Sequence, residues 1–92
     1  MRKHDVLISD TARRQLNDLP EKQRERVRAA LFGLADDPFR PRPKADIKPL
    51  RGPNRNYYRL RIGEYRAIYV VEGDKVLVAK ILARSKAYDW LD

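Results

Sequence analysis

Three segments in the second half of the chain have the composition of β-strands and are separated by glycine-containing turns. They span residues 57–62, 65–71 and 76–82, with Gly63-Glu64 and Gly73-Asp74 between them. Their tyrosine, valine and isoleucine content favours extended backbone, and glycine in a two-residue loop is typical of a β-hairpin. The chain must therefore build around an antiparallel meander, and one face of that meander needs an apolar cover.

The first half of the chain supplies that cover. Residues 6–8 predict a short first strand, and Ser9-Asp10-Thr11 offers N-cap residues for a helix directly after it. Apolar residues then recur at helical spacing on both sides of Pro20, until Pro38 ends the pattern. We predict a single α+β domain over residues 1–92. It consists of a short N-terminal strand, a helical hairpin and a three- to four-stranded antiparallel sheet packed on the helices.

The lack of cysteine and the single histidine, His4, exclude several kinds of active site. Thiolate nucleophiles and thiolate zinc sites need cysteine, and one imidazole cannot form a metal cluster. We therefore expect no metal and no cofactor. No apolar run approaches the roughly 20 residues that a membrane helix needs, and the run at the start is too short for a signal peptide. A cytoplasmic protein without membrane contact is expected.

The positive charge is concentrated in the middle of the chain. The formal net charge is +8, and residues 40–66 hold nine basic against two acidic residues, a net charge of +7. Seven of these nine are arginines, whose planar guanidinium pairs with phosphate through two hydrogen bonds. Such a concentration of positive charge is typical of proteins that bind a polyanion.

Strand alternation predicts where this charge lies on the sheet. If Gly63-Glu64 forms the turn, one face of the hairpin carries Tyr57, Arg59, Arg61 and Arg66. The other face carries residues suited to packing on the helices: Tyr58, Leu60, Ile62, Ala67 and Tyr69. Because opposed like charges repel, the arginines are expected to share an anion; the alternative is that they splay into solvent or pair with Glu64 and neighbouring residues. The same count places Lys80 on the core face, unless a bulge or a shifted turn intervenes.

Three motifs resemble the RelE/ParE superfamily of bacterial and archaeal toxins. The first is Lys48-Pro49-Leu50-Arg51-Gly52, the second is the hairpin of residues 58–69 with its "G-x-Y-R-x-x-Y" pattern, and the third is Arg84 with Tyr88. The resemblance covers essentially the whole chain and implies a RelE-like fold. RelE-like members are ribosome-dependent mRNA endonucleases (mRNA interferases), whereas ParE-like members poison DNA gyrase.

The resemblance favours the RelE-like branch and implies the partners of such a toxin. These are a RelB-like antitoxin, mRNA in the ribosomal A site and ribosomal RNA. It also implies that Arg59, Arg61, Arg66, Arg84 and Tyr88 match the family's site positions. Two alternatives stay open: a ParE-like gyrase inhibitor without nuclease activity, and a catalytically weak relative that acts only in an antitoxin repressor complex.

Metal-independent cleavage of RNA uses the ribose 2′-hydroxyl as the nucleophile on the adjacent phosphate. Arg61 and Arg66 are the candidates for stabilising the non-bridging oxygens. Tyr88 is the candidate general base, because nearby guanidiniums lower the pKa of a phenol; the alternative is that its ring packs with Trp90. Arg84 is expected to bind charge, and Lys86 is a candidate acid.

The remaining candidates are residues that bind RNA without taking part in the chemistry. Arg59 is expected to orient the RNA backbone, and Tyr57 to stack on a base. Lys48 and Arg51 are expected to contact phosphate or ribosomal RNA, unless they only keep an edge strand soluble. Lys86 completes the predicted RNA-binding set.

Overall fold

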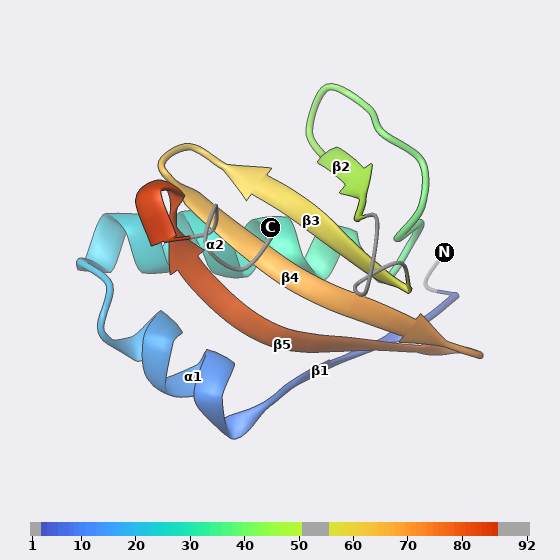
Figure 1. The fold of residues 1–92 in the computed structure, drawn as a ribbon, viewed down its shortest axis with the longest axis horizontal. Helices are drawn as coiled ribbons and strands as arrows, with labels where there is room; N and C mark the ends of the chain where they lie inside the picture. Colours follow the sequence, from blue (N-terminus) through green and yellow to red (C-terminus); the bar gives the residue numbers. More distant parts are fainter. Residues whose placement is uncertain (1–2, 51–55, 87–92) are drawn as a thin grey trace.

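The computed structural model describes residues 3–50 and 56–86, and in this part of the chain two helices cover one face of a five-stranded sheet (Figure 1). The elements in chain order are β1 (Asp5–Ile8), α1 (Asp10–Asn17), α2 (Glu21–Gly33), β2 (Asp46–Pro49), β3 (Tyr57–Ile62), β4 (Tyr65–Glu72) and β5 (Lys75–Ala83). The predicted α+β fold is confirmed. Its N-terminal strand joins the sheet parallel to β5, so the strand order is β1-β5-β4-β3-β2.

Local signals in the sequence explain where these elements begin and turn. Ser9 caps α1, because its Oγ accepts a hydrogen bond of 3.0 Å from the Ala12 amide. Both hairpin glycines are left-handed, with φ of 58° at Gly63 and 60° at Gly73, a conformation that costs glycine little. The two tight turns therefore fix the register of the meander.

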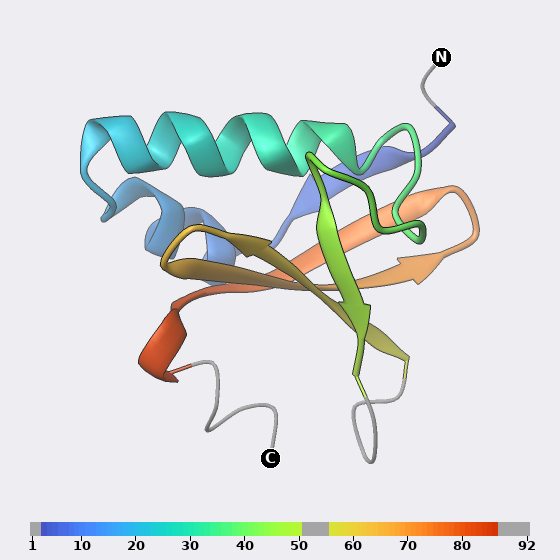
Figure 2. The ribbon, with the colours of Figure 1, turned by 90° about the horizontal axis from the view of Figure 1, so that it is seen from above.

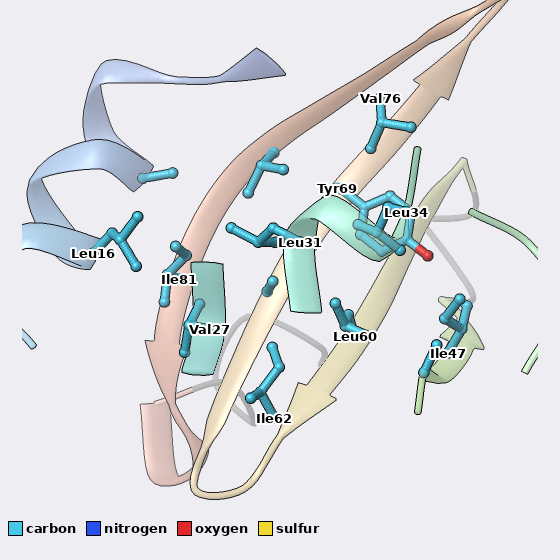
Figure 3. Packing of buried hydrophobic residues seen from close by; sticks show 14 residues of the cluster. Leu16, Val27, Leu31, Leu34, Ile47, Leu60, Ile62, Tyr69, Val76 and Ile81 are labelled. Atoms are coloured by element: carbon cyan, nitrogen blue, oxygen red, sulfur yellow. The ribbon is translucent and has the colours of Figure 1, made fainter. Parts of the chain in front are cut away.

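The apolar core lies between the helices and one face of the sheet (Figure 3). Val27 and Leu31 from α2, with Leu34 at its C-cap, pack against the sheet, and Leu16 from α1 packs near Ile81 of β5. The predicted core-face residues of β3 and β4 lie in or against this cluster. Burial of this apolar surface stabilises the fold and fixes which face of the sheet is left uncovered.

The connector between α2 and β2 is held by side-chain bonds to backbone carbonyls. The Tyr69 hydroxyl donates to the Pro38 carbonyl at 2.6 Å, and the ring of Tyr69 stacks on that of Tyr58 at 5.6 Å. The Arg42 guanidinium donates to the carbonyls of Asp37 at 2.9 Å and of Gly33 at 3.1 Å. This arginine of the basic segment therefore ties down the end of α2.

A bulge in β5 decides the side on which Lys80 lies. Ile68 pairs with Lys80 but Tyr69 pairs with Val78, so Ala79 is an extra residue in β5. Because directly paired residues share a face, Lys80 lies with Ile68 on the face away from the core cluster. The simple alternation that placed Lys80 on the core face is wrong, and the bulge is the reason.

Candidate nucleic-acid interface

The uncovered face of the sheet carries two rows of side chains that run across four strands. Figure 2 shows α1 and α2 on one side of the sheet and the other side open. The strand registers define the first row as Asp46, Arg61, Arg66 and Leu82, and the second as Lys48, Arg59, Ile68 and Lys80. We call the five basic residues of these rows the cationic face: Lys48, Arg59, Arg61, Arg66 and Lys80. The predicted grouping of Arg59, Arg61 and Arg66 on one face is confirmed.

A carboxylate holds two of these arginines. Arg59 donates from Nη2 to Asp46 Oδ1 at 3.1 Å, and Arg61 Nη1 lies 3.9 Å from Asp46 Oδ2. The Arg59 side chain is 17% exposed and that of Arg61 is 54% exposed. Arg59 is therefore fixed against the sheet, whereas Arg61 presents its guanidinium to solvent. Among the described residues, Arg59 Nε is buried without a hydrogen-bond acceptor, which adds an unpaired donor beneath the face.

Arg66 lies deeper in the face than its neighbours. It is 7% exposed, and its Nη1 donates to the carbonyls of Gly63 at 2.8 Å and Tyr65 at 2.9 Å. These bonds fix the guanidinium against the β3–β4 turn. Its charge is therefore held in place before any ligand arrives, which is the preorganisation that stabilises developing negative charge.

The chain after β5 brings Arg84 to the same end of the sheet. The Arg84 amide donates to the Glu64 carbonyl at 2.8 Å, so the helical turn 84–86 is tied to the β3–β4 turn. Glu64, Tyr65 and Arg84 line a pocket of about 360 Å³ there. Arg84 and Lys86 are both exposed. Arg84 thus lies at the same corner of the sheet as Arg61 and Arg66, which the β3–β4 hairpin pairs directly.

The opposite end of the uncovered face is apolar. Tyr57 pairs with Val70, Val70 with Leu77, and Leu77 with Leu7 of β1. These four side chains help to line a shallow pocket of about 360 Å³, and Leu7 is 47% exposed. Tyr57 therefore stands where the cationic face meets an apolar surface, a position from which an aromatic ring can stack on a base.

The remaining candidate residues are Lys48, Arg51, Tyr88 and the single histidine, His4. Tyr88 and Arg51 fall outside the described residues. Lys48 is exposed on β2 opposite Arg59. His4 precedes β1 and packs edge-on against Phe39 at 6.0 Å between ring centroids, away from the β3–β4 turn where Arg66 and Arg84 lie.

Sequence reasoning missed two members of this face. Simple alternation places Lys80 on the other side, and the conflict between a lysine and an apolar core left a bulge or a shifted turn as the two explanations. Asp46 was not singled out, because its pairing with Arg59 depends on the register of β2, which a four-residue strand specifies weakly. Asp46 is one of two acidic residues in the basic segment 40–66, and that was the signal for it.

The arrangement can hold an extended anion on a shallow surface. Within residues 3–50 and 56–86, three or more potential metal ligands do not come together. No helix in that part of the chain is long and apolar enough to cross a membrane. What the face offers is positive charge at different depths: a fixed, buried guanidinium in Arg66 and an exposed one in Arg61.

Known toxins resemble this chain in sequence and in fold. Residues 6–88 match the family model described as the ParE toxin of type II toxin-antitoxin system, parDE. The chain is 32% identical over 85 residues to toxin RelE3 of Methanocaldococcus jannaschii. The aligned region covers 92% of this chain and 96% of that protein.

Solved structures agree with the sequence comparison. The toxin-antitoxin complex RelBE2 from Mycobacterium tuberculosis matches with a TM-score of 0.77 at 28% identity, over 89% of this chain and 99% of that chain. The archaeal RelE-RelB complex from Pyrococcus horikoshii OT3 matches with a TM-score of 0.76 at 28% identity, over 91% and 98%.

Proposed function

Because this chain belongs to the RelE/ParE superfamily of toxins of type II toxin-antitoxin systems, we propose that it is a ribosome-dependent mRNA endonuclease that inhibits translation. The observation that carries this proposal is the cationic face. Arg61 and Arg66 are directly paired like charges, which repel, and an RNA backbone supplies a row of anions that offsets such repulsion.

The residues divide into groups that bind and groups that act on the phosphate. Lys48, Arg59 and Lys80 form the row that positions the RNA backbone, and Tyr57, in the adjoining apolar row, stacks on a base. Arg61 and Arg66 stabilise the non-bridging oxygens of the scissile phosphate. The 2′-oxygen attacks phosphorus and the bond to the 5′-oxygen breaks, which leaves a 2′,3′-cyclic phosphate and a 5′-hydroxyl. This step needs no metal.

Residues near the C-terminal end of the chain carry out the proton transfers. Tyr88 accepts the proton of the 2′-hydroxyl, and Lys86 supplies one to the departing 5′-oxygen. Arg84 binds the charge that develops on the phosphate. The amide of Arg84 is tied to Glu64 at 2.8 Å, and this contact places the start of the segment beside Arg66.

Two macromolecular partners follow from this role. The solved relatives include RelE-RelB and RelBE2 complexes of toxin and antitoxin, and we propose that a RelB-like antitoxin binds and inactivates this chain too. When free, the toxin acts on mRNA in the ribosomal A site, where Arg51 and other basic residues contact ribosomal RNA.

The test separates the ribosome from gyrase as the target. Purified protein is added to a reconstituted translation reaction and, separately, to DNA gyrase with supercoiled and relaxed DNA. Cleavage of the message with no effect on gyrase is expected. Inhibited gyrase with intact message would instead establish the ParE-like activity, and no response from either target would leave only a role in an antitoxin complex.

A further inference from the structure

A second group of basic residues lines a pocket beside the edge of the sheet. Arg26 from α2, Lys44 from the connector and Arg61 from β3 line this pocket, whose volume is about 400 Å³. The acidic residue in its lining is Asp46. Three elements that are distant in sequence thus bring cations to one cavity, and α2 is not part of the cationic face.

The Arg26 guanidinium lies against the β3–β4 turn. A Cβ atom built on Gly63 would lie 2.9 Å from Arg26 Nη1 and 3.3 Å from its Cζ, so the guanidinium lies directly over the glycine. Among the described residues, the side chains of Arg26 and Lys44 make no hydrogen bond or ion pair, and both residues are exposed. Both cations are therefore available to a ligand.

The charge of the pocket favours an anion despite the carboxylate. Three positive groups face one negative group, and Asp46 already accepts a hydrogen bond from Arg59 at 3.1 Å. Arg61 lines this pocket and also belongs to the cationic face. An anion in the pocket would thus lie next to one on the sheet, as successive phosphates of one strand do.

We propose that this pocket is a second phosphate-binding site, which holds a backbone phosphate of the same single-stranded RNA that crosses the cationic face. The inference rests on the proposed function, since it takes RNA as the substrate. Arg26 and Lys44 contact the phosphate, and Arg61 links the two sites.

The experiment measures binding without chemistry. A fluorescent 2′-O-methyl RNA of about ten nucleotides cannot be cleaved through its 2′-position, and its anisotropy reports affinity at several salt concentrations without ribosomes. The test variant is Arg26→Gln with Lys44→Gln. The control variant, Arg14→Gln with Lys22→Gln, removes the same charge from exposed helix positions outside the pocket lining.

We expect the pocket variant to bind about five- to tenfold more weakly, and its salt dependence to fall by about 0.7 in slope, the value for one phosphate of a single strand. The control variant should lose less than about twofold and keep the slope. The single variant Arg26→Lys, with Lys44 unchanged, should bind nearly as tightly as the parent, because it keeps the charge. Thermal melting confirms that each variant is folded.

Other outcomes would overturn the proposal. Equal losses in the pocket and control variants would mean that only overall charge matters, and a parent that does not bind the RNA has no second site. If RNA binding is unchanged while binding of poly-glutamate falls in the pocket variant, the pocket takes an acidic protein segment instead. Cleavage on ribosomes is assayed separately. Unchanged RNA binding in the pocket variant would remove the second site without affecting the proposed nuclease, and a lack of cleavage by the parent would remove the nuclease without affecting the binding result.

Discussion

The two faces of the sheet are built from alternate residues of the same strands, yet one packs on the helices and the other carries the cationic face. In β3, Leu60 is 1% exposed and Ile62 is 6% exposed under the helices, whereas the Arg61 side chain between them is 54% exposed on the other side. Strand pleating thus separates stability from function by single positions. Substitutions on the covered face should change the free energy of unfolding, and those on the uncovered face should change activity.

The uncovered face is not simply a solvated surface. Ile68 is fully buried there and Arg66 is 7% exposed, although neither packs in the core cluster under the helices. Arg66 pairs with Arg61 and Ile68 pairs with Lys80 across neighbouring strands, so two cations of the face stand beside buried residues. The uncovered face therefore includes buried positions, and the hydrogen bonds of Arg66 hold its charge in place there.

The largest effect is expected on the covered face. Leu31 of α2 is 1% exposed in the core, and Leu31→Ala should lower the free energy of unfolding by about 2–5 kcal/mol, because it removes packed methyl groups and leaves a cavity. Urea denaturation measures this. RNA binding by the fraction still folded should match the parent, and a specific loss of affinity in that fraction would break the separation of the faces.

Arg61→Ala should give the opposite result. We expect the rate of mRNA cleavage to fall by about 10²–10³-fold, because one donor to the phosphate oxygens is lost. The melting temperature should stay near that of the parent, since the side chain is largely exposed. Cleavage kinetics and thermal melting are measured on the same preparation. Arg14→Ala on α1 is the control and should cleave at the parent rate.

Tyr69→Phe tests the link between the core and the connector. The variant loses the hydrogen bond to the Pro38 carbonyl and leaves that oxygen unpaired, so the free energy of unfolding should fall by about 1–3 kcal/mol. Cleavage by the folded fraction should be unchanged. A larger loss of cleavage than of stability would show that the connector also positions the uncovered face.

The same variant has a defined pH dependence. Burial raises the pKa of the Tyr69 phenol well above its usual value of 10.0, so folding favours the protonated form. The stability from Tyr69 is complete below about pH 10 and is lost as the pH rises above it, because the unfolded phenol ionises first. The difference in stability between parent and Tyr69→Phe should therefore shrink above pH 10. A constant difference would contradict this burial.

The smallest effect is expected at Asp46. Asp46→Asn frees Arg59 and Arg61 from a competing carboxylate, and exposed ion pairs of this kind are worth about 0.2–1 kcal/mol. Affinity for the 2′-O-methyl RNA should rise by about two- to fivefold. Asp18→Asn, at the exposed end of α1, removes the same charge and should change affinity less. Weaker binding by Asp46→Asn would mean that the carboxylate orients the arginines.

Much of the fold was readable in the sequence because local signals agree with it. The glycine turns, the Ser9 cap and the alternation in β3 each predict the element that forms. The parallel pairing of β1 with β5 was not predicted, since a four-residue strand carries no signal for its neighbour. The position of the bulge at Ala79 could not be predicted for a related reason, because the pairing between β4 and β5 decides where it lies.

The candidate site was predictable in its strand residues and not beyond them. Alternation alone placed Arg59, Arg61 and Arg66 together. The depth of Arg66 and the pairing of Arg59 with Asp46 depend on how the turn and the edge strand fold over the face, which residue spacing does not encode. The roles assigned to Tyr88 and Arg51 stay predictions.

The proposed nuclease depends on the cationic face holding a phosphate while the neighbouring 2′-oxygen attacks it. The most direct measurement is the chemical nature of the RNA ends left after message is treated with the protein on purified translating ribosomes. The account predicts a 2′,3′-cyclic phosphate or 3′-phosphate paired with a 5′-hydroxyl, and neither product with Arg61→Ala. Intact message, or ends with a 3′-hydroxyl and a 5′-phosphate, would contradict it.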